Sequence, residues 1–220
     1  MNISEYIEHT LLKQDATKDG LAKLFEEAKE NNFLGVCVNP CFVRDAKTAL
    51  KDSDVKIVTV IGFPLGANTS EVKAFETKKA LEDDADEIDM VINVSKLKDK
   101  DFEYVKQDIE AVRHACPNNI LKVILETDLL TKDEIKKACE ICIDAKADLV
   151  KTSTGFVKNG VGAKVEDVEL MYKTVSPFGL KVKASGGIRD AEKALALINA
   201  GASRLGTSSG LKIAEEMRNK

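Results

Sequence analysis

The chain is poor in several features that would direct it to other functions. Its 220 residues include only two histidines, His9 and His114, and neither has a second ligand at the spacing of a metal site. The net charge is −4 with both signs interspersed, which gives no support for binding to nucleic acid or a membrane surface. No apolar run approaches the ~18 residues of a membrane span, and no signal peptide is visible at the N-terminus. We therefore expect a cytoplasmic protein without a metal, nucleic-acid or membrane partner.

The five cysteines form no disulfide framework. Their odd number and wide spacing indicate reduced thiols, as in the cytosol. Cys139 and Cys142 make a C-x-x-C pattern, but they lie within a helical pattern over residues 133–146. We interpret them as buried small side chains rather than as a redox pair.

Short apolar runs alternate with amphipathic segments along the whole chain. Continuous apolar runs are typical of strands covered on both faces, as in a parallel sheet. The runs that predict strands are 9–12, 35–38, 56–62, 87–92, 121–126, 149–151, 181–184 and 203–206. Helical patterns include 41–51, 70–82, 101–115 and 132–146, and Leu21, Leu24, Phe25 and Ala28 show helical spacing before them.

Eight strand–helix units without a linker predict an α/β protein, a single TIM (β/α)8 barrel over residues 1–220. The structural alternative is an open doubly wound sheet. No G-x-G-x-x-G follows an early strand, which counts against a dinucleotide-binding version of that sheet.

Two lysines at the ends of neighbouring predicted strands are the most informative feature. Lys151 ends the run 149–151 before Thr-Ser-Thr-Gly, and Lys183 ends the next run before Ala-Ser-Gly-Gly. A buried ammonium without a partner is costly, and a neutral lysine attacks carbonyl carbon. We expect imine chemistry at Lys151, with Lys183 as the cation that keeps it deprotonated. The alternatives are a surface lysine at position 151 and a phosphate or carboxylate contact at position 183.

Asp89 lies inside an apolar predicted strand and needs a cation or donor beside it. With two lysines nearby it is a candidate proton relay, and the alternative is a capping or edge carboxylate. Lys122 and Glu126 on the following strand are further candidates, with a buried ion pair as the alternative.

Small-residue turns follow the last strands, where barrels of this kind bind phosphate through loop amides and a helix N-terminus. They are Gly186-Gly187 and Ser208-Ser209, and Thr154-Gly155 can add donors. Cys37 ends the second strand, either as a pocket residue or as a small apolar wall residue. Glu8 and His9 near the first strand are candidates for polar contacts.

Seven segments in this order resemble the deoxyribose-phosphate aldolase family. They are I-E-H-T-L-L-K, G-V-C-V-N-P, V-T-V-I-G-F-P-L-G, A-D-E-I-D-M-V-I-N, L-K-V-I-L-E-T, D-L-V-K-T-S-T-G-F and V-K-A-S-G-G-I-R. The resemblance implies a TIM barrel without a metal or organic cofactor. It also implies reversible cleavage of 2-deoxy-D-ribose 5-phosphate to D-glyceraldehyde 3-phosphate and acetaldehyde, in a homodimer or homotetramer.

The resemblance also assigns roles. It makes Lys151 the Schiff-base lysine, Lys183 the second catalytic lysine and Asp89 the relay. It makes Cys37 and Glu8 substrate-pocket residues, with phosphate held by Gly186, Gly187, Ser208 and Ser209 and with Thr154 and Gly155 nearby. We expect the imine to open the C3–C4 bond.

Two departures from the family pattern matter. Glu8 stands where many members have aspartate, so its contact with substrate or a neighbour is open. The chain has no C-terminal tyrosine, since its tyrosines are Tyr6, Tyr104 and Tyr172. Water or Asp89 would then carry the proton that a tail tyrosine carries elsewhere.

Two other functions fit the same residues. One is a phosphate-barrel isomerase or a different class I aldolase, and the other is a non-catalytic barrel that binds sugar phosphates. Release of aldehyde and trapping of an imine separate them.

Overall fold

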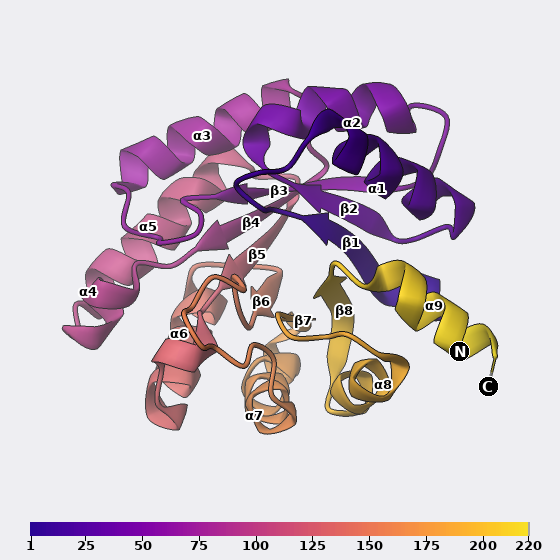
Figure 1. The fold of residues 1–220 in the computed structure, drawn as a ribbon. Helices are drawn as coiled ribbons and strands as arrows, with labels where there is room; N and C mark the ends of the chain where they lie inside the picture. The colour runs from indigo at the N-terminus through magenta and orange to yellow at the C-terminus, as the bar shows by residue number, and fades with distance from the viewer. Residues whose placement is uncertain (220) are drawn as a thin grey trace.

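A computed structural model describes residues 1–219. Within that range the strands form a closed parallel barrel in chain order, surrounded by helices (Figure 1). The strands are β1 (Ile7–Leu11), β2 (Gly35–Val38), β3 (Lys56–Ile61), β4 (Glu87–Val91), β5 (Ile120–Ile124), β6 (Leu149–Lys151), β7 (Lys181–Ser185) and β8 (Ala202–Thr207). The predicted TIM barrel is thereby confirmed, and the open sheet is wrong because β1 pairs with both β2 and β8.

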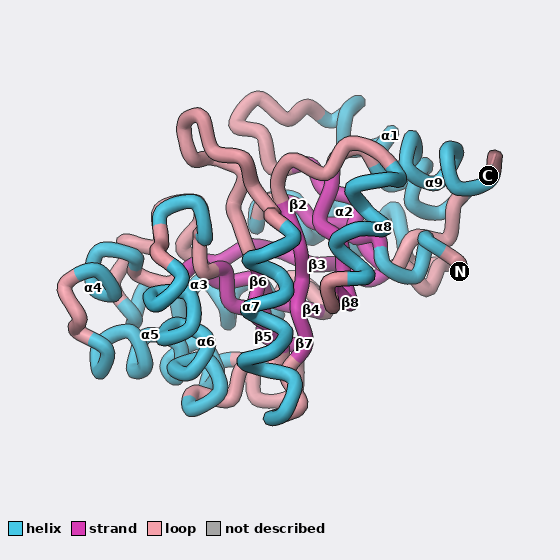
Figure 2. Tube along the Cα trace, turned by 90° about the horizontal axis from the view of Figure 1, so that it is seen from below, coloured by secondary structure: helices cyan, strands magenta, loops and turns pink. Residues whose placement is uncertain are grey.

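The outer layer consists of helices that follow the strands (Figure 2). They are α1 (Lys18–Glu30), α2 (Val43–Leu50), α3 (Ser70–Glu82), α4 (Val94–Lys98), α5 (Phe102–Ala115), α6 (Lys132–Asp144), α7 (Val165–Val175), α8 (Ala191–Asn199) and α9 (Gly210–Arg218). Short 3-10 turns are η1 (Ile3–Tyr6), η2 (Pro40–Phe42), η3 (Thr127–Leu129) and η4 (Ser176–Phe178). Turn η1 contacts α9, so the first and last elements lie side by side.

Local sequence sets where several helices begin. The side chains of Thr17, Asp101 and Asp190 accept hydrogen bonds from the first turns of α1, α5 and α8. Thr131 and Glu134 form a capping box that starts α6. Such caps satisfy backbone N–H groups that have no partner inside the helix.

The first strand begins at Ile7, two residues before the predicted start, so Glu8 lies within β1. The fifth strand ends at Ile124, which leaves Glu126 beyond it. Cys139 and Cys142 are buried free thiols on α6, as their helical interpretation predicted. Burial raises the pKa of Cys139 to about 12 and that of Cys142 well above its ordinary value, which suits packing rather than redox chemistry.

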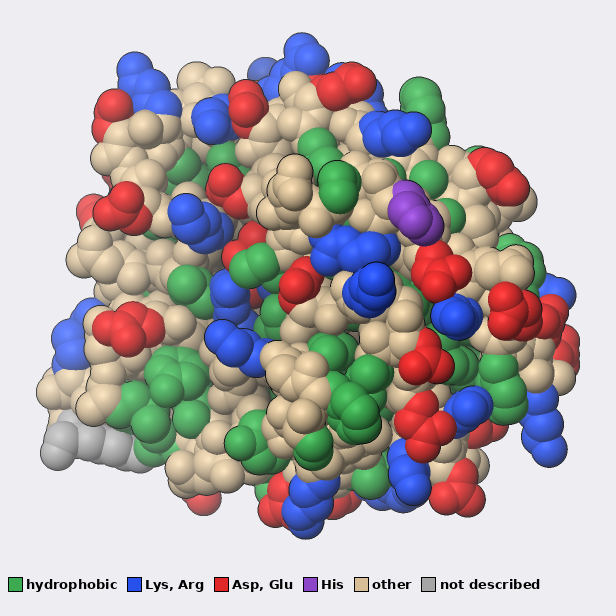
Figure 3. All heavy atoms as spheres, turned by 180° about the vertical axis from the view of Figure 1, so that it is seen from behind, with side chains coloured by type: hydrophobic (Ala, Val, Ile, Leu, Met, Phe, Trp, Pro, Cys, Tyr) green, Lys and Arg blue, Asp and Glu red, His purple; other side chains and the backbone are tan. Residues whose placement is uncertain are grey.

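The surface carries charges of both signs, as the composition predicts. Lysine and arginine side chains are interspersed with aspartate and glutamate over the face in Figure 3. Among residues 1–219, the helices are all too short or too polar to cross a membrane.

Strand register decides which side chains meet inside the barrel. Lys151 pairs with Lys183 across β6 and β7, and Asp89 pairs with Lys122 across β4 and β5. Side chains alternate between the two faces of a strand, so paired residues of neighbouring parallel strands point to the same side. The register therefore gathers charged residues in the barrel interior.

Candidate active site

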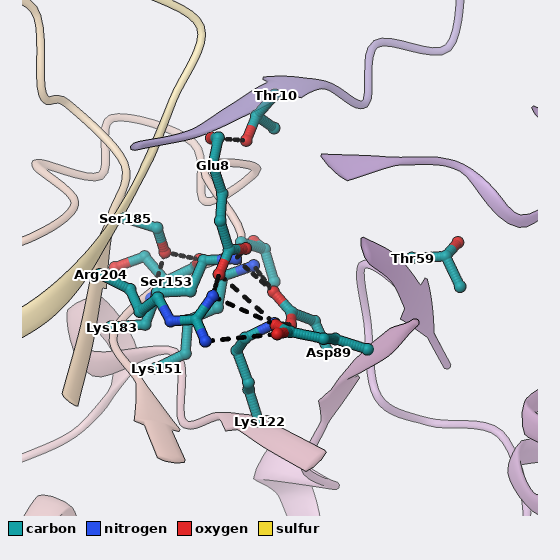
Figure 4. Close-up of polar contacts among 12 residues, drawn as sticks. Glu8, Thr10, Thr59, Asp89, Lys122, Lys151, Ser153, Lys183, Ser185 and Arg204 are labelled. Atoms are coloured by element: carbon teal, nitrogen blue, oxygen red, sulfur yellow. Dashed lines mark hydrogen bonds and ion pairs between the residues drawn. The ribbon is translucent and has the colours of Figure 1, made fainter. Parts of the chain in front are cut away.

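A cluster of seven ionisable side chains occupies the barrel interior, and Figure 4 labels all of them except Glu87. The members come from six strands, and each contacts another member within the distance of a salt bridge. They are Glu8, Glu87, Asp89, Lys122, Lys151, Lys183 and Arg204. Four are cationic and three anionic when all are ionised, so the cluster then carries one surplus positive charge.

Asp89 is the centre of this cluster. Its Oδ2 accepts hydrogen bonds from Lys151 Nζ and Lys183 Nζ, each at 2.7 Å, and its Oδ1 accepts from Lys122 Nζ at 2.9 Å. Burial by itself would raise the pKa of Asp89, but the three ammonium groups outweigh burial and hold the pKa well below its usual range. Asp89 is therefore an ionised carboxylate despite being fully buried.

Lys183 is held as a cation. Its Nζ donates to Glu8 as well as to Asp89, and the side chain is fully buried. Burial disfavours the charged form, but Asp89 and Glu8 more than offset it and raise the pKa of Lys183 above its ordinary value. The positive charge of Lys183 and the amine of Lys151 therefore share one oxygen, Oδ2 of Asp89. This places Lys183 beside Lys151, as the ends of the two predicted strands indicated.

Beneath Asp89 lie three charged groups, of which the sequence predicted only Lys122 as a candidate, with a buried ion pair as the alternative. Lys122 Nζ lies 2.6 Å from Glu87, and Arg204 lies 3.2 Å from the same carboxylate. Glu87 and Arg204 were missed as site residues. The sequence signal for Glu87 is its position two residues before Asp89 on one strand. Arg204 has no such signal, because its register with Lys183 exists only in the folded barrel.

A cavity of about 770 Å³ opens above this cluster at the carboxyl ends of the strands. Within residues 1–219, Lys151 is the one lysine of the ion cluster that lines it, while Lys122 and Lys183 are fully buried below. Six predicted substrate residues also line the cavity: Thr154, Gly155, Gly186, Gly187, Ser208 and Ser209. The structure thus brings Lys151, the predicted Schiff-base lysine, and all three predicted turns to one space.

The conformation of the glycine turn requires glycine. Gly187 has a φ of 68°, and a Cβ there would lie 2.4 Å from the carbonyl oxygen of Val161. On the other side of the cavity, Ser209 precedes α9, whose first turn carries free backbone N–H groups. Both features suit the close approach of an anion to backbone amides.

The structure places Glu8 and Cys37 outside the cavity lining, and their expected contacts with substrate stay predictions. Glu8 is fully buried and pairs with Lys183, so it supports the second lysine rather than reaching the cavity. Burial would raise the pKa of Glu8, but Lys122 and Lys183 lower it. Cys37 is also fully buried, in a small apolar group with Leu12, Val58 and Val60, and burial raises its pKa. Among the described residues, neither side chain is part of the cavity lining.

His9 does not take part in the interior cluster. Its Nε2 lies 2.7 Å from Glu27 on α1, and its ring packs edge-on against Phe33. Within residues 1–219, no group of three or more His, Cys, Asp or Glu side chains has the arrangement of a metal site.

Comparison with known proteins gives one consistent result. Residues 5–216 match the family described as DeoC/LacD family aldolase. The deoxyribose-phosphate aldolase of Finegoldia magna is 55% identical over 215 residues, which cover 98% of this chain and 100% of that protein. The enzyme of the same name from Lactococcus lactis subsp. lactis is also 55% identical, over 98% of this chain and 96% of that one.

Solved structures agree with the sequence comparison. A crystal structure described as a putative deoxyribose-phosphate aldolase from Coccidioides immitis has a TM-score of 0.96 at 45% identity, covering 99% of this chain and 86% of that one. The deoxyribose phosphate aldolase of Aeropyrum pernix, described as tetrameric, has a TM-score of 0.90 at 33% identity, over 99% and 91%. The chain therefore belongs to the DeoC/LacD aldolase family.

Proposed function

We propose that this chain is a class I deoxyribose-phosphate aldolase that forms its imine at Lys151. The observation that carries the proposal is the position of Lys151. Lys151 lines the cavity, and its Nζ donates a hydrogen bond to Asp89 below the cavity. The same carboxylate oxygen accepts a hydrogen bond from the cationic Lys183. Two relatives named deoxyribose-phosphate aldolase, each 55% identical over nearly the whole of this chain, support 2-deoxy-D-ribose 5-phosphate as the substrate.

In the proposed reaction, the Lys151 ammonium first gives its proton to water, and the neutral Nζ attacks C1 of the open-chain sugar. The carbinolamine then takes up a proton and loses water, which gives a protonated imine. The C2–C3 bond then breaks, its electron pair moves to the imine nitrogen, and the C3 hydroxyl loses its proton to give the aldehyde. Protonation of the enamine carbon and hydrolysis release acetaldehyde. The expected C3–C4 cleavage was wrong, because acetaldehyde retains only C1 and C2 and the three-carbon product begins at C3.

Asp89 and Lys183 take two roles in this scheme. Ionised Asp89 neutralises the imine cation that forms at Lys151, at the distance it already holds to Nζ. With Lys183 and a water molecule it relays the proton that leaves the C3 hydroxyl. General acid–base help of this kind is typically worth ~10²–10⁴ in rate.

The turns around the cavity would hold the phosphate end of the substrate. We assign this role to Gly186, Gly187, Ser208 and Ser209, with Thr154 and Gly155 adding donors. The backbone amides of Gly186 and Gly187 can approach a phosphate closely because glycine has no side chain in the way. The N-terminus of α9 also favours an anion. The chemistry uses side chains alone and needs no metal or organic cofactor.

Incubation with 2-deoxy-D-ribose 5-phosphate tests the proposal. The aldolase releases acetaldehyde and glyceraldehyde 3-phosphate in equal amounts, and a dehydrogenase specific for each product measures them. Conversion of the sugar without release of aldehyde would indicate an isomerase instead. Binding without conversion would indicate a non-catalytic barrel.

We also propose that the whole chain, residues 1–220, is one catalytic domain of a cytoplasmic homodimer or homotetramer. The tetrameric relative from Aeropyrum pernix and the reduced cysteines support this. Light scattering on the purified protein measures the mass, and a monomer at micromolar concentration would contradict the assembly.

A further inference from the structure

The loop between β6 and α7, residues 152–164, is held at both ends by acids that follow β5. Near its start, the Glu126 carboxylate accepts a hydrogen bond from the backbone N–H of Thr154 at 3.0 Å and another from its hydroxyl. Near its end, Asp128 accepts from the N–H of Gly162 at 2.7 Å and lies 3.2 Å from Lys164 Nζ. Two acids thus fix one loop at two points.

The surroundings of each acid fix the position of its carboxylate. Glu126 is buried and has a φ of 61°, in the left-handed region that non-glycine residues rarely adopt. The conformation follows the end of β5 and directs the carboxylate to Thr154. Gly160 packs so closely on Asp128 that a Cβ would lie 2.8 Å from Oδ2. Asp128 is therefore covered by the loop that it holds.

The loop in turn contacts both the mouth of the cavity and the phosphate turn. Phe156 packs edge-on against Phe63 from the loop after β3, with ring centroids 5.2 Å apart. At the other end, the N–H of Ala163 donates to the carbonyl of Gly186 at 3.0 Å, and a Cβ on Gly162 would lie 2.3 Å from the Gly186 backbone. Movement of the loop would therefore move Gly186.

We propose that Glu126 and Asp128 are positioning residues for phosphate recognition. They hold the loop so that Thr154 and Gly155 on one side and Gly186 on the other face the cavity in a fixed geometry. Within the described chain they lie outside the lining of the main cavity and face a smaller one, of about 390 Å³, behind the loop. The inference rests on the proposed function, since the bound group is the substrate phosphate.

Steady-state kinetics on a graded series test the positioning role. Asp128→Ala removes both contacts, Asp128→Asn keeps an acceptor for Gly162, and Lys164→Met removes only the ion pair. Asp144→Asn, at an exposed acid of α6, is the matched control.

We expect KM for 2-deoxyribose 5-phosphate to rise about tenfold in Asp128→Ala, less in Asp128→Asn and least in Lys164→Met, with kcat within about threefold. Glu126→Gln should raise KM in the same way. KM for unphosphorylated 2-deoxyribose should stay near the wild-type value in every variant. Equal losses for both sugars, or an unchanged KM in Asp128→Ala, would overturn the proposal.

A second measurement reports the loop without relying on activity. The chain has no tryptophan, so Phe156→Trp places a single tryptophan on the loop, which is excited apart from the three tyrosines. Acrylamide should quench it at least twofold more strongly when Asp128→Ala is added, and equal quenching would contradict the clamp. Failure of the wild type to cleave the substrate would instead refute the proposed function, whatever the quenching shows.

Discussion

Two buried sites in the described structure, each centred on an aspartate with lysine partners, have opposite electrostatic outcomes. One is the interior cluster around Asp89, and the other joins Lys73 of α3 to Asp108 of α5 outside the barrel. Burial lowers the pKa of Lys73 and raises that of Asp108, and their mutual attraction does not overcome it. Around Asp89 the attraction prevails, and the pKa of Asp89 is low while that of Lys183 is high.

The number of partners explains the difference. Asp108 accepts from one ammonium group and from the hydroxyl of Ser70 at 2.9 Å, whereas Asp89 accepts from three ammonium groups. Each added opposite charge offsets more of the desolvation cost that both sites bear. The comparison teaches that a single buried pair serves packing, and that a charge network maintains ionised groups for chemistry.

The largest expected contrast is in activity. Asp89→Asn removes the counter-charge of the imine and the relay, and we expect kcat to fall by about 10²–10⁴. Asp108→Asn should leave kcat within about threefold, because Asp108 contacts no residue of the interior cluster in the described structure. Steady-state assays of both purified variants, with unfolding in urea as the check on folding, measure this. Comparable losses of kcat in the two variants would refute the claim that the cluster around Asp89 serves catalysis and the Lys73–Asp108 pair does not.

The two sites should also give opposite dependences of stability on pH. Because the folded pKa of Asp89 is depressed, its stabilisation is present above the ordinary aspartate value of about 3.9 and is lost as pH falls through the folded value. Because the folded pKa of Asp108 is raised, its contribution is present below about 3.9 and is lost as pH rises through the folded value.

Urea unfolding of wild type, Asp89→Asn and Asp108→Asn between about pH 2 and about pH 7 measures these slopes. The difference in unfolding free energy between wild type and Asp89→Asn should shrink as pH falls below about 3.9. For Asp108→Asn the wild-type advantage should shrink as pH rises above it. Slopes of the same sign would contradict the assigned ionisation states.

The smallest expected effect concerns Glu76, beside Lys73. Its carboxylate accepts the N–H of Gly62 at 2.7 Å, and burial raises its pKa. Glu76→Gln keeps an acceptor there, so we expect the unfolding free energy to change by about 0.5 kcal/mol or less. A larger loss in urea unfolding would mean that the ionised carboxylate matters at this site too.

The sequence predicted most of the barrel and the central residues of the site. Lys151, Lys183 and Asp89 were identifiable because each is a charged residue in or at the end of an apolar strand. Eight apolar runs matched the eight strands, because continuous burial leaves a strong local pattern. The site roles of these residues stay predictions until they are measured.

What the sequence did not predict depends on non-local geometry. Arg204 and Lys122 both reach Glu87 only after the barrel closes and sets the register. Glu8 was expected at the substrate, but it lies two residues before the cavity-lining Thr10 on the same face of β1, deeper in the barrel. Helix α4 is five residues long and left no clear period in the sequence.

Chemical trapping tests the central claim most directly. The protein is treated with acetaldehyde and borohydride, and intact mass and peptide mapping locate the reduced two-carbon adduct. We predict one adduct per chain, at Lys151, which is absent from Lys151→Met and retained in Lys73→Met. An adduct that maps to Lys73, Lys122 or Lys183, or trapping that survives in Lys151→Met, would contradict the account.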